Sequence, residues 1–228
     1  MIKVKTPEER LDAAVLASGG PPRSDEDLQQ LARAAREELK AHPKARPWWM
    51  DGLVLLALNL VMGLGAAAAM SWSDLQHGSM TMRSVVAVAW LLMMSVGSVL
   101  WLRPGAMTSR LLVGAGFVIA SALAIGGASG FDPGAPFFRG MGCAFTECSV
   151  ALIPLSVLLV LSTRFAATPS HVFAGALAAA SGGALALHLH CTNGTIAHIV
   201  VFHLLPAVVL GGIAVLIRSK LRTKTLVP

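Results

Sequence analysis

The chain has 228 residues, of which 55% are hydrophobic and only 13% are charged, and its net charge is +6 at pH 7. Soluble domains carry about 25% charged residues, so this composition excludes an ordinary water-soluble domain. Residues 1–47 hold seventeen of the thirty charged side chains, nine basic and eight acidic. Because this segment is nearly neutral, the positive net charge does not indicate direct nucleic-acid binding.

Residues 1–47 predict a cytoplasmic head of two short amphipathic helices. The first begins at the capping pattern Thr6-Pro7-Glu8-Glu9 and ends at the Gly-Gly-Pro-Pro of residues 19–22. The second begins near Ser24 and ends before Pro43. Apolar side chains recur along both helices at helical spacing. Six of them are the predicted anchors for a partner: Leu11, Val15, Leu16, Leu28, Leu31 and Leu39.

The apolar stripes of the head need a surface to cover them, because two such short helices bury little area by themselves. They either lie on the membrane and the cytoplasmic loops or dock into a groove of a partner protein. Their mixed charge favours a protein partner, since helices that seek lipid have a basic polar face.

The rest of the chain predicts six apolar spans, each long enough for a membrane core that takes about 20 residues. Their approximate ranges are 51–72, 82–102, 109–129, 148–164, 171–189 and 195–217. The predicted fold is therefore all-α. A head (1–47) precedes a six-span transmembrane bundle (48–217), and a basic tail (218–228) follows it. Glycines and alanines in the spans predict close helix packing, which also allows a homodimer.

The distribution of Lys and Arg predicts that both termini are cytoplasmic. With the N-terminus inside, sixteen of the eighteen basic residues lie on the cytoplasmic side, and only Arg83 and Arg139 lie outside. The basic loops and tail are then expected to contact anionic membrane lipid. The spans carry almost no ionisable groups at mid-membrane, where Asn59 and His203 are the main polar residues. This argues against a pump or ion-coupled carrier.

Cysteines and histidines gather at the predicted outer face. Cys143 and Cys148 precede or begin the fourth span, and Cys191 lies in the turn between the fifth and sixth spans. Four histidines accompany Cys191 in the sequence: His188, His190, His198 and His203.

Three interpretations of these residues compete. One of Cys143 or Cys148 could form a disulfide with Cys191 in an oxidising periplasm. Alternatively, thiols and imidazoles could sense an oxidant or bind zinc or copper. A haem on His203 has least support, because residues five apart diverge by about 140° on an α-helix, which separates His198 from His203. We expect a sensor or a disulfide at Cys191, no active site, and a packing or relay role for His203.

The overall pattern resembles the multi-pass membrane anti-sigma factors of the NrsF and CarR type. The residues that carry the resemblance are Gly142-Cys143, Pro154, His190-Cys191 and the head motif from Thr6 to Leu16. The resemblance covers nearly the whole chain.

This resemblance implies a regulator of the bacterial inner membrane and no enzyme. The head would sequester an extracytoplasmic-function sigma factor and release it when a stress signal is sensed in or across the membrane. The outer cysteine pair linked to signalling in that family corresponds to Cys143 and Cys191. Cys148 and the histidines depart from a two-cysteine pattern. They leave open an alternative, a membrane redox protein that binds a metal or haem.

Overall fold

The structure is a computed structural model that describes residues 47–70, 80–101, 103, 107–132, 137–164 and 167–221, together with Gln29 and Arg33. The six predicted anchors of the head lie outside the described residues. The division into head, bundle and tail accordingly stays a prediction.

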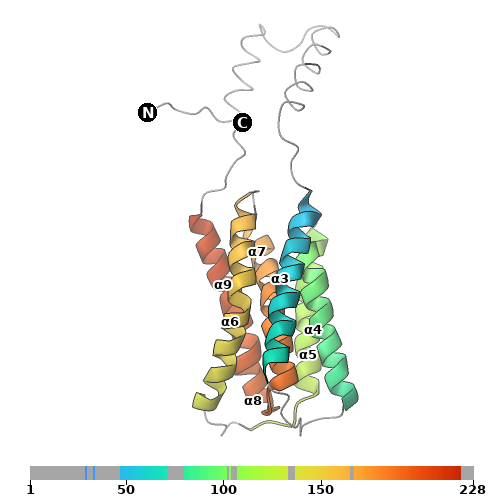
Figure 1. Cartoon of the computed structure of the whole chain (residues 1–228), viewed down its shortest axis with the longest axis vertical. Coiled ribbons are helices and arrows are strands. Elements are labelled where there is room, and N and C mark those ends of the chain that lie inside the picture. The colour runs from blue at the N-terminus through green and yellow to red at the C-terminus, as the bar shows by residue number, and fades with distance from the viewer. Residues whose placement is uncertain are drawn as a thin grey trace. The chain divides into compact units, whose positions relative to one another are not determined.

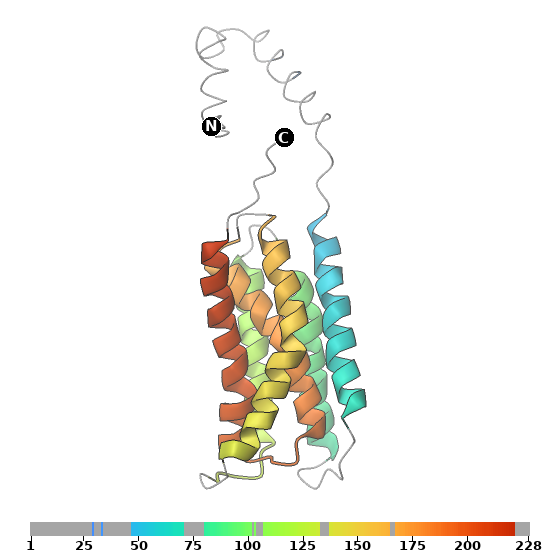
Figure 2. The same ribbon diagram turned by 60° about the vertical axis from the view of Figure 1, so that its left-hand side comes forward.

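The described residues contain six helices that are long and apolar enough to cross a membrane, and no strand. The all-α, six-helix bundle predicted from the sequence is confirmed. Five spans are α3 (Trp48–Ala69), α4 (Met80–Leu100), α5 (Met107–Gly126), α6 (Phe137–Ser162) and α7 (Pro169–His190). The sixth joins α8 (Ile196–Ile199), a π-helical segment η1 (Val200–Leu204) and α9 (Leu205–Lys220). The helices run up and down side by side (Figures 1 and 2).

The fourth span begins earlier than the predicted residue 148, because α6 starts at Phe137. The first turns of α6 are amphipathic. Met141 and Phe145 face outward with 49% and 75% of their surface exposed, whereas Glu147 is fully buried. The buried Glu147 and the glycines Gly140 and Gly142 lowered the apparent hydrophobicity of this stretch, although Met141 and Phe145 are apolar. Cys143 and Cys148 therefore lie within the helix.

Helix α7 is the centre of the bundle and is buried along most of its length. It consists largely of alanine and glycine, which let neighbouring backbones approach closely. A Cβ on Gly63 of α3 would lie 3.0 Å from Cα of Gly182, and a Cβ on Gly183 would lie 2.9 Å from Cγ of Glu147. The predicted packing role holds for these glycines. By contrast, Gly65 and Gly114 have open space where a Cβ would stand.

Asn59 links three helices inside the bundle. Its Nδ2 donates to Oγ of Ser98 on α4 at 2.8 Å and to the carbonyl of Ala178 on α7 at 3.3 Å. Because lipid offers no hydrogen-bond partners, such buried polar contacts help to specify which helices pack together.

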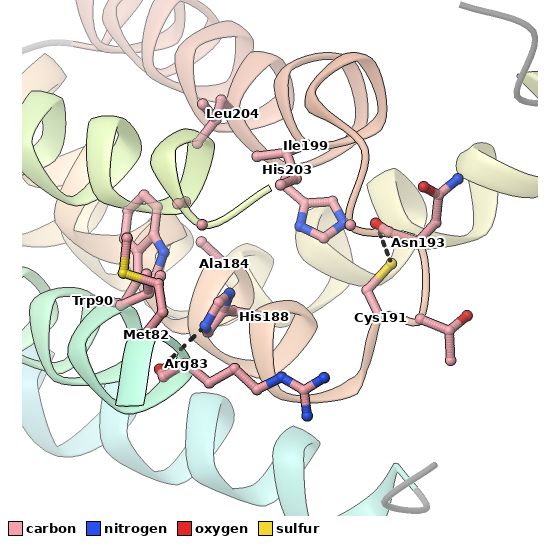
Figure 3. Close-up of a pocket in the computed structure, with 15 residues that line it drawn as sticks. Met82, Arg83, Trp90, Ala184, His188, Cys191, Asn193, Ile199, His203 and Leu204 are labelled. Atoms are coloured by element: carbon pink, nitrogen blue, oxygen red, sulfur yellow. Dashed lines mark hydrogen bonds between the residues drawn. The ribbon is translucent and has the colours of Figure 1, made fainter. Parts of the chain in front are cut away.

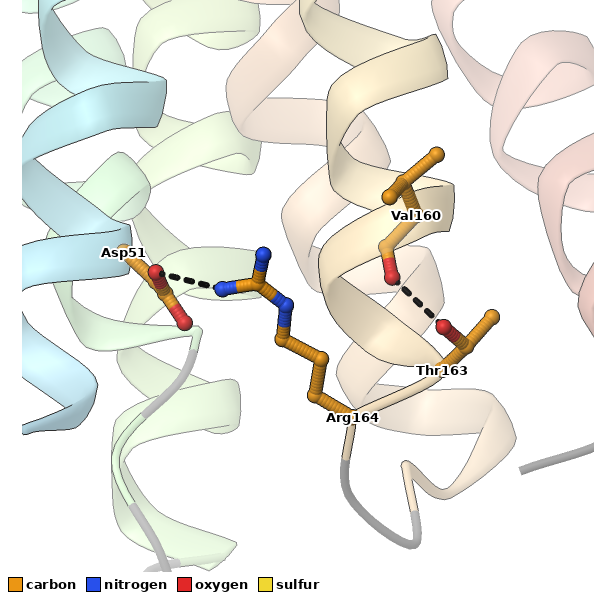
Figure 4. A network of polar contacts seen from close by, with 4 residues as sticks. All are labelled: Asp51, Val160, Thr163 and Arg164. Carbon is orange, nitrogen blue, oxygen red and sulfur yellow. Dashed lines mark hydrogen bonds and ion pairs between the residues drawn. The ribbon is translucent and has the colours of Figure 1, made fainter. Parts of the chain in front are cut away.

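The two ends of the bundle differ in chemistry. At the end where α3 begins, Arg164 reaches Asp51 at 3.4 Å (Figure 4). There Arg110 also donates to Thr168 and Ser170, at 3.0 and 2.7 Å. Arg218, near the end of α9, donates from Nε to the carbonyl of Ser162 at 3.2 Å. The cysteines and the four predicted site histidines (His188, His190, His198 and His203) lie toward the opposite end, where α6 begins and α7 ends.

Candidate functional site

Cys191 directly follows the last residue of α7 and opens the short turn to the sixth span, as predicted. Its backbone N–H closes the last turn of α7 on the carbonyl of Leu187. Oδ1 of Asn193 accepts from the backbone N–H and the hydroxyl of Thr195, at 3.1 and 2.9 Å. Two backbone hydrogen bonds, Ser129 to Gly194 and Ile196 to Gly130, join this turn to the segment after α5. The Cys191 backbone is thus held from both sides.

The expected divergence of His198 and His203 is wrong. Their ring centroids are 5.1 Å apart. The cause is the π-helical segment, in which the N–H of Leu205 bonds the carbonyl of Val200, five residues back. A π-turn places residues five apart on one face, whereas an α-helix separates them by about 140°. Pro206 favours the wider turn because it has no N–H and its ring crowds the carbonyl of Phe202.

The π-turn brings two histidines against two cysteines. We call the four residues the Cys/His cluster: Cys143, Cys191, His198 and His203. One potential ligand atom from each lies within 4.8 Å of the other three. The two Sγ atoms are 3.7 Å apart, and Sγ of Cys191 is 3.2 Å from Nε2 of His198. Both cysteines are free thiols.

The packing around the cluster keeps the π-turn against α6. A Cβ at Gly140 would overlap the ring of Phe202, so only glycine admits this aromatic side chain there. The same Phe202 ring lies 5.1 Å from the His198 ring. Both histidines are buried, with 4% of His198 and 6% of His203 exposed. Nε2 of His203 has no hydrogen-bond partner.

A pocket of about 60 Å³ borders the cluster (Figure 3). Cys191 and His203 line one part of it, and Trp90 and His188 line another. Nε2 of His188 contacts the carbonyl of Arg83 at 3.3 Å across this pocket. The pocket gives a small species access to the cluster from beside the turn.

The electrostatics of the turn favour a reactive thiol at Cys191. The hydrogen bond with Cys143 outweighs the opposing effect of burial and, together with a backbone hydrogen bond with Asn193, lowers the pKa of Cys191 to about 7. A thiolate is the nucleophile and the metal ligand of cysteine chemistry. The cluster can therefore form a disulfide between Cys143 and Cys191 or hold a metal ion.

The chain resembles carotenogenesis protein CarR of Myxococcus xanthus along nearly its whole length. The two are 28% identical over 222 residues, which cover 96% of this chain and 98% of CarR. No protein-family model and no solved structure matches the chain. CarR is one of the two protein types that the sequence pattern resembles, and the similarity extends over nearly the whole chain.

The remaining predicted site residues lie outside the cluster. Cys148 follows Cys143 by five residues on α6 and therefore points to a different side of that helix. His188 lines the pocket, and His190 is the last residue of α7. The four metal candidates among the histidines are thus divided, with His198 and His203 in the cluster and His188 and His190 beyond it.

Glu147 is a buried carboxylate close to the cluster that was not among the predicted site residues. It lies one turn beyond Cys143 on α6, is fully buried, and has no hydrogen-bond partner on either carboxylate oxygen. Gly183 of α7 packs directly on it. A carboxylate among apolar residues of a span is the available sequence signal, since such groups are rare in membranes.

Proposed function

We propose that the chain is a membrane-bound anti-sigma factor. Residues 1–47 hold an extracytoplasmic-function sigma factor away from RNA polymerase, and the six-span bundle releases it on a stress signal. The observation that carries this proposal is the similarity to CarR across 96% of the chain, which includes the head as well as the spans. The resemblance to anti-sigma factors of the NrsF and CarR type supports the same conclusion, and the proposed role is regulatory and not enzymatic.

The proposed location is the bacterial inner membrane, with both termini in the cytoplasm. Support comes from the cationic end of the bundle, where Arg110, Arg164 and Arg218 lie. Positively charged loops are retained on the cytoplasmic side. In this orientation the Cys/His cluster lies near the outer face, where an envelope stress arrives first.

The sixth span connects the cluster to the cytoplasmic end. His198 and His203 lie near its start, and Arg218 and Lys220 lie at its end. A chemical change at the cluster alters contacts between this span, α6 and α7. A ligand or bond that favours one packing of the bundle shifts the population between two arrangements.

A membrane redox protein that binds a metal or haem at the outer Cys/His cluster is the alternative that the sequence left open. The pocket beside the cluster measures about 60 Å³. Pockets for drug-sized ligands measure about 300–1,000 Å³, and haem is larger than most of these ligands. This pocket is therefore too small for a haem, whereas a metal ion at the cluster is compatible with the regulatory function.

The test is a pull-down of chromosomally tagged, full-length protein from detergent-solubilised membranes. We expect an extracytoplasmic-function sigma factor among the partners. A variant with Leu28→Asp and Leu31→Asp should lose that partner and switch on a reporter that depends on the sigma factor, because charges prevent burial of the apolar stripe.

Gln29→Asp provides a matched control, because Gln29 is exposed and helical and lies between the two leucines. This variant should retain the sigma factor and repress the reporter. Normal repression by the doubly substituted protein, or a wild-type pull-down without a sigma factor, would contradict the proposal.

A further inference from the structure

We propose that the Cys/His cluster binds one Zn²⁺ ion. The four ligands come from three separate parts of the chain: Cys143 from α6, Cys191 from the turn, and His198 and His203 from the start of the sixth span. This inference rests on the geometry of the cluster. It does not depend on the proposed binding of a sigma factor, so either proposal can fail alone.

The ligand set and spacing fit tetrahedral zinc. Two thiolates and two imidazoles form a closed four-ligand site, for which zinc is the usual ion. With Zn–S bonds of about 2.3 Å, tetrahedral angles place two sulfurs about 3.8 Å apart. The Sγ atoms of Cys143 and Cys191 are 3.7 Å apart. The sulfur–nitrogen distance of 3.2 Å from Cys191 to His198 is also near the separation of about 3.6 Å that zinc imposes.

The charge of such a complex suits its place in the bundle. Two thiolates neutralise the two positive charges of Zn²⁺, and both imidazoles bind in their neutral form. The complex therefore carries no net charge. A neutral complex is needed at this position because His198 and His203 are buried, and an uncompensated charge within a membrane span is costly.

His203 gives independent support. Its Nε2 atom is buried and has no hydrogen-bond partner, although buried polar atoms are nearly always satisfied. In the zinc complex this nitrogen donates its lone pair to the metal ion and is no longer without a partner. The π-turn that carries His203 is a rare conformation, found mostly at functional sites. Without that turn His203 would lie on another face of the sixth span.

The decisive experiment measures zinc binding by purified full-length protein in detergent. The protein is reduced anaerobically, stripped with a chelator and titrated with Zn²⁺ against a chromophoric competitor. We expect one equivalent of zinc per chain. Cobalt added in place of zinc should give the visible absorption of tetrahedral Co²⁺ and a thiolate charge-transfer band, which report both geometry and sulfur ligation.

Variants separate ligation from folding. Cys143→Ser and His198→Ala should each weaken zinc binding more than about tenfold. Loss of a contact that only supports a ligand already lowers metal affinity by about tenfold or more, and loss of the ligand itself should lower it further. His198→Cys supplies a thiolate at the same position and should retain the metal. Cys148→Ser and His190→Ala alter residues outside the cluster and should bind zinc as the wild type does.

Three results would overturn the proposal. The first is a reduced, monodisperse wild-type protein that binds less than a tenth of an equivalent of zinc. The second is unchanged zinc affinity in both Cys143→Ser and His198→Ala. The third is selective binding of Cu⁺ with no competition from Zn²⁺, which would assign the cluster to copper.

Discussion

At the residue scale, the chemistry of the bundle is concentrated in a few polar side chains. Cys143 and Cys191 lie close enough to share a hydrogen bond or a metal ion, and Cys148 has no part in the cluster. The pairing implied by the family resemblance is therefore compatible with the geometry. A disulfide and a zinc ion exclude each other, because the disulfide removes both thiolates.

Oxidation of the metal-free protein should join Cys143 to Cys191. A diazene oxidant such as diamide accepts two electrons and two protons from the thiols, forming one S–S bond and a hydrazine. Peptide mass spectrometry should find this crosslink and none to Cys148. Zinc-loaded protein should form it at least tenfold more slowly. A dominant Cys148–Cys191 crosslink would contradict the arrangement of these helices.

At the element scale, one irregular helix segment determines the site. The π-turn at Val200–Leu204 turns His203 toward the cysteines, and Phe202 holds it against Gly140 of α6. Glycine is needed at position 140 because of this close approach and not because of its backbone conformation, since the residue is helical.

Gly140→Ala should displace the Phe202 ring and destabilise the bundle by about 1–3 kcal/mol, as overpacking does. Zinc affinity should fall with it, because Phe202 and His203 are adjacent on the π-turn. Thermal unfolding in detergent and zinc titration are the measurements. Gly142→Ala is the matched control, since a Cβ there has nothing within 4 Å. Equal stability of the two variants would argue against the packing of Phe202 on α6.

At the scale of the whole molecule, α7 is the shared partner of the other spans, and chemistry is divided between the two ends. One end holds Asp51 with Arg110, Arg164 and Arg218, and the other holds the Cys/His cluster. The basic end predicts the orientation in the membrane, and that orientation decides which compartment reaches the cluster.

Single-cysteine labelling tests the orientation. In a background with Cys143, Cys148 and Cys191 changed to serine, Thr192→Cys and Ser219→Cys place an exposed thiol at opposite ends of the bundle. A membrane-impermeant maleimide applied to spheroplasts should label the first protein, and should label the second only after lysis. Labelling in the reverse order would place the termini outside.

The sequence by itself determined the fold class, an all-α bundle of apolar helices, and the number of candidate membrane spans. Length and apolar composition suffice for this, because a membrane core demands about 20 apolar residues from any helix that crosses it. The position of Cys191 in the connection between the fifth and sixth spans was also predictable, because this residue lies between two apolar runs. The start of α6 was not predictable, since Glu147 and two glycines interrupt the apolar pattern of its first turns.

Only the tertiary structure decided which side chains meet. An ideal helix separates His198 from His203, and a local π-turn before Pro206 brings them together. Cys143 joins them from 48 residues before Cys191 because α6 and α7 pack closely through Gly183. Contacts of this kind depend on helix rotation and interhelical distance. Neither quantity can be read from hydrophobic periodicity. The sequence therefore predicted that cysteines and histidines form the site, and the packing of the helices decided which of them are in contact.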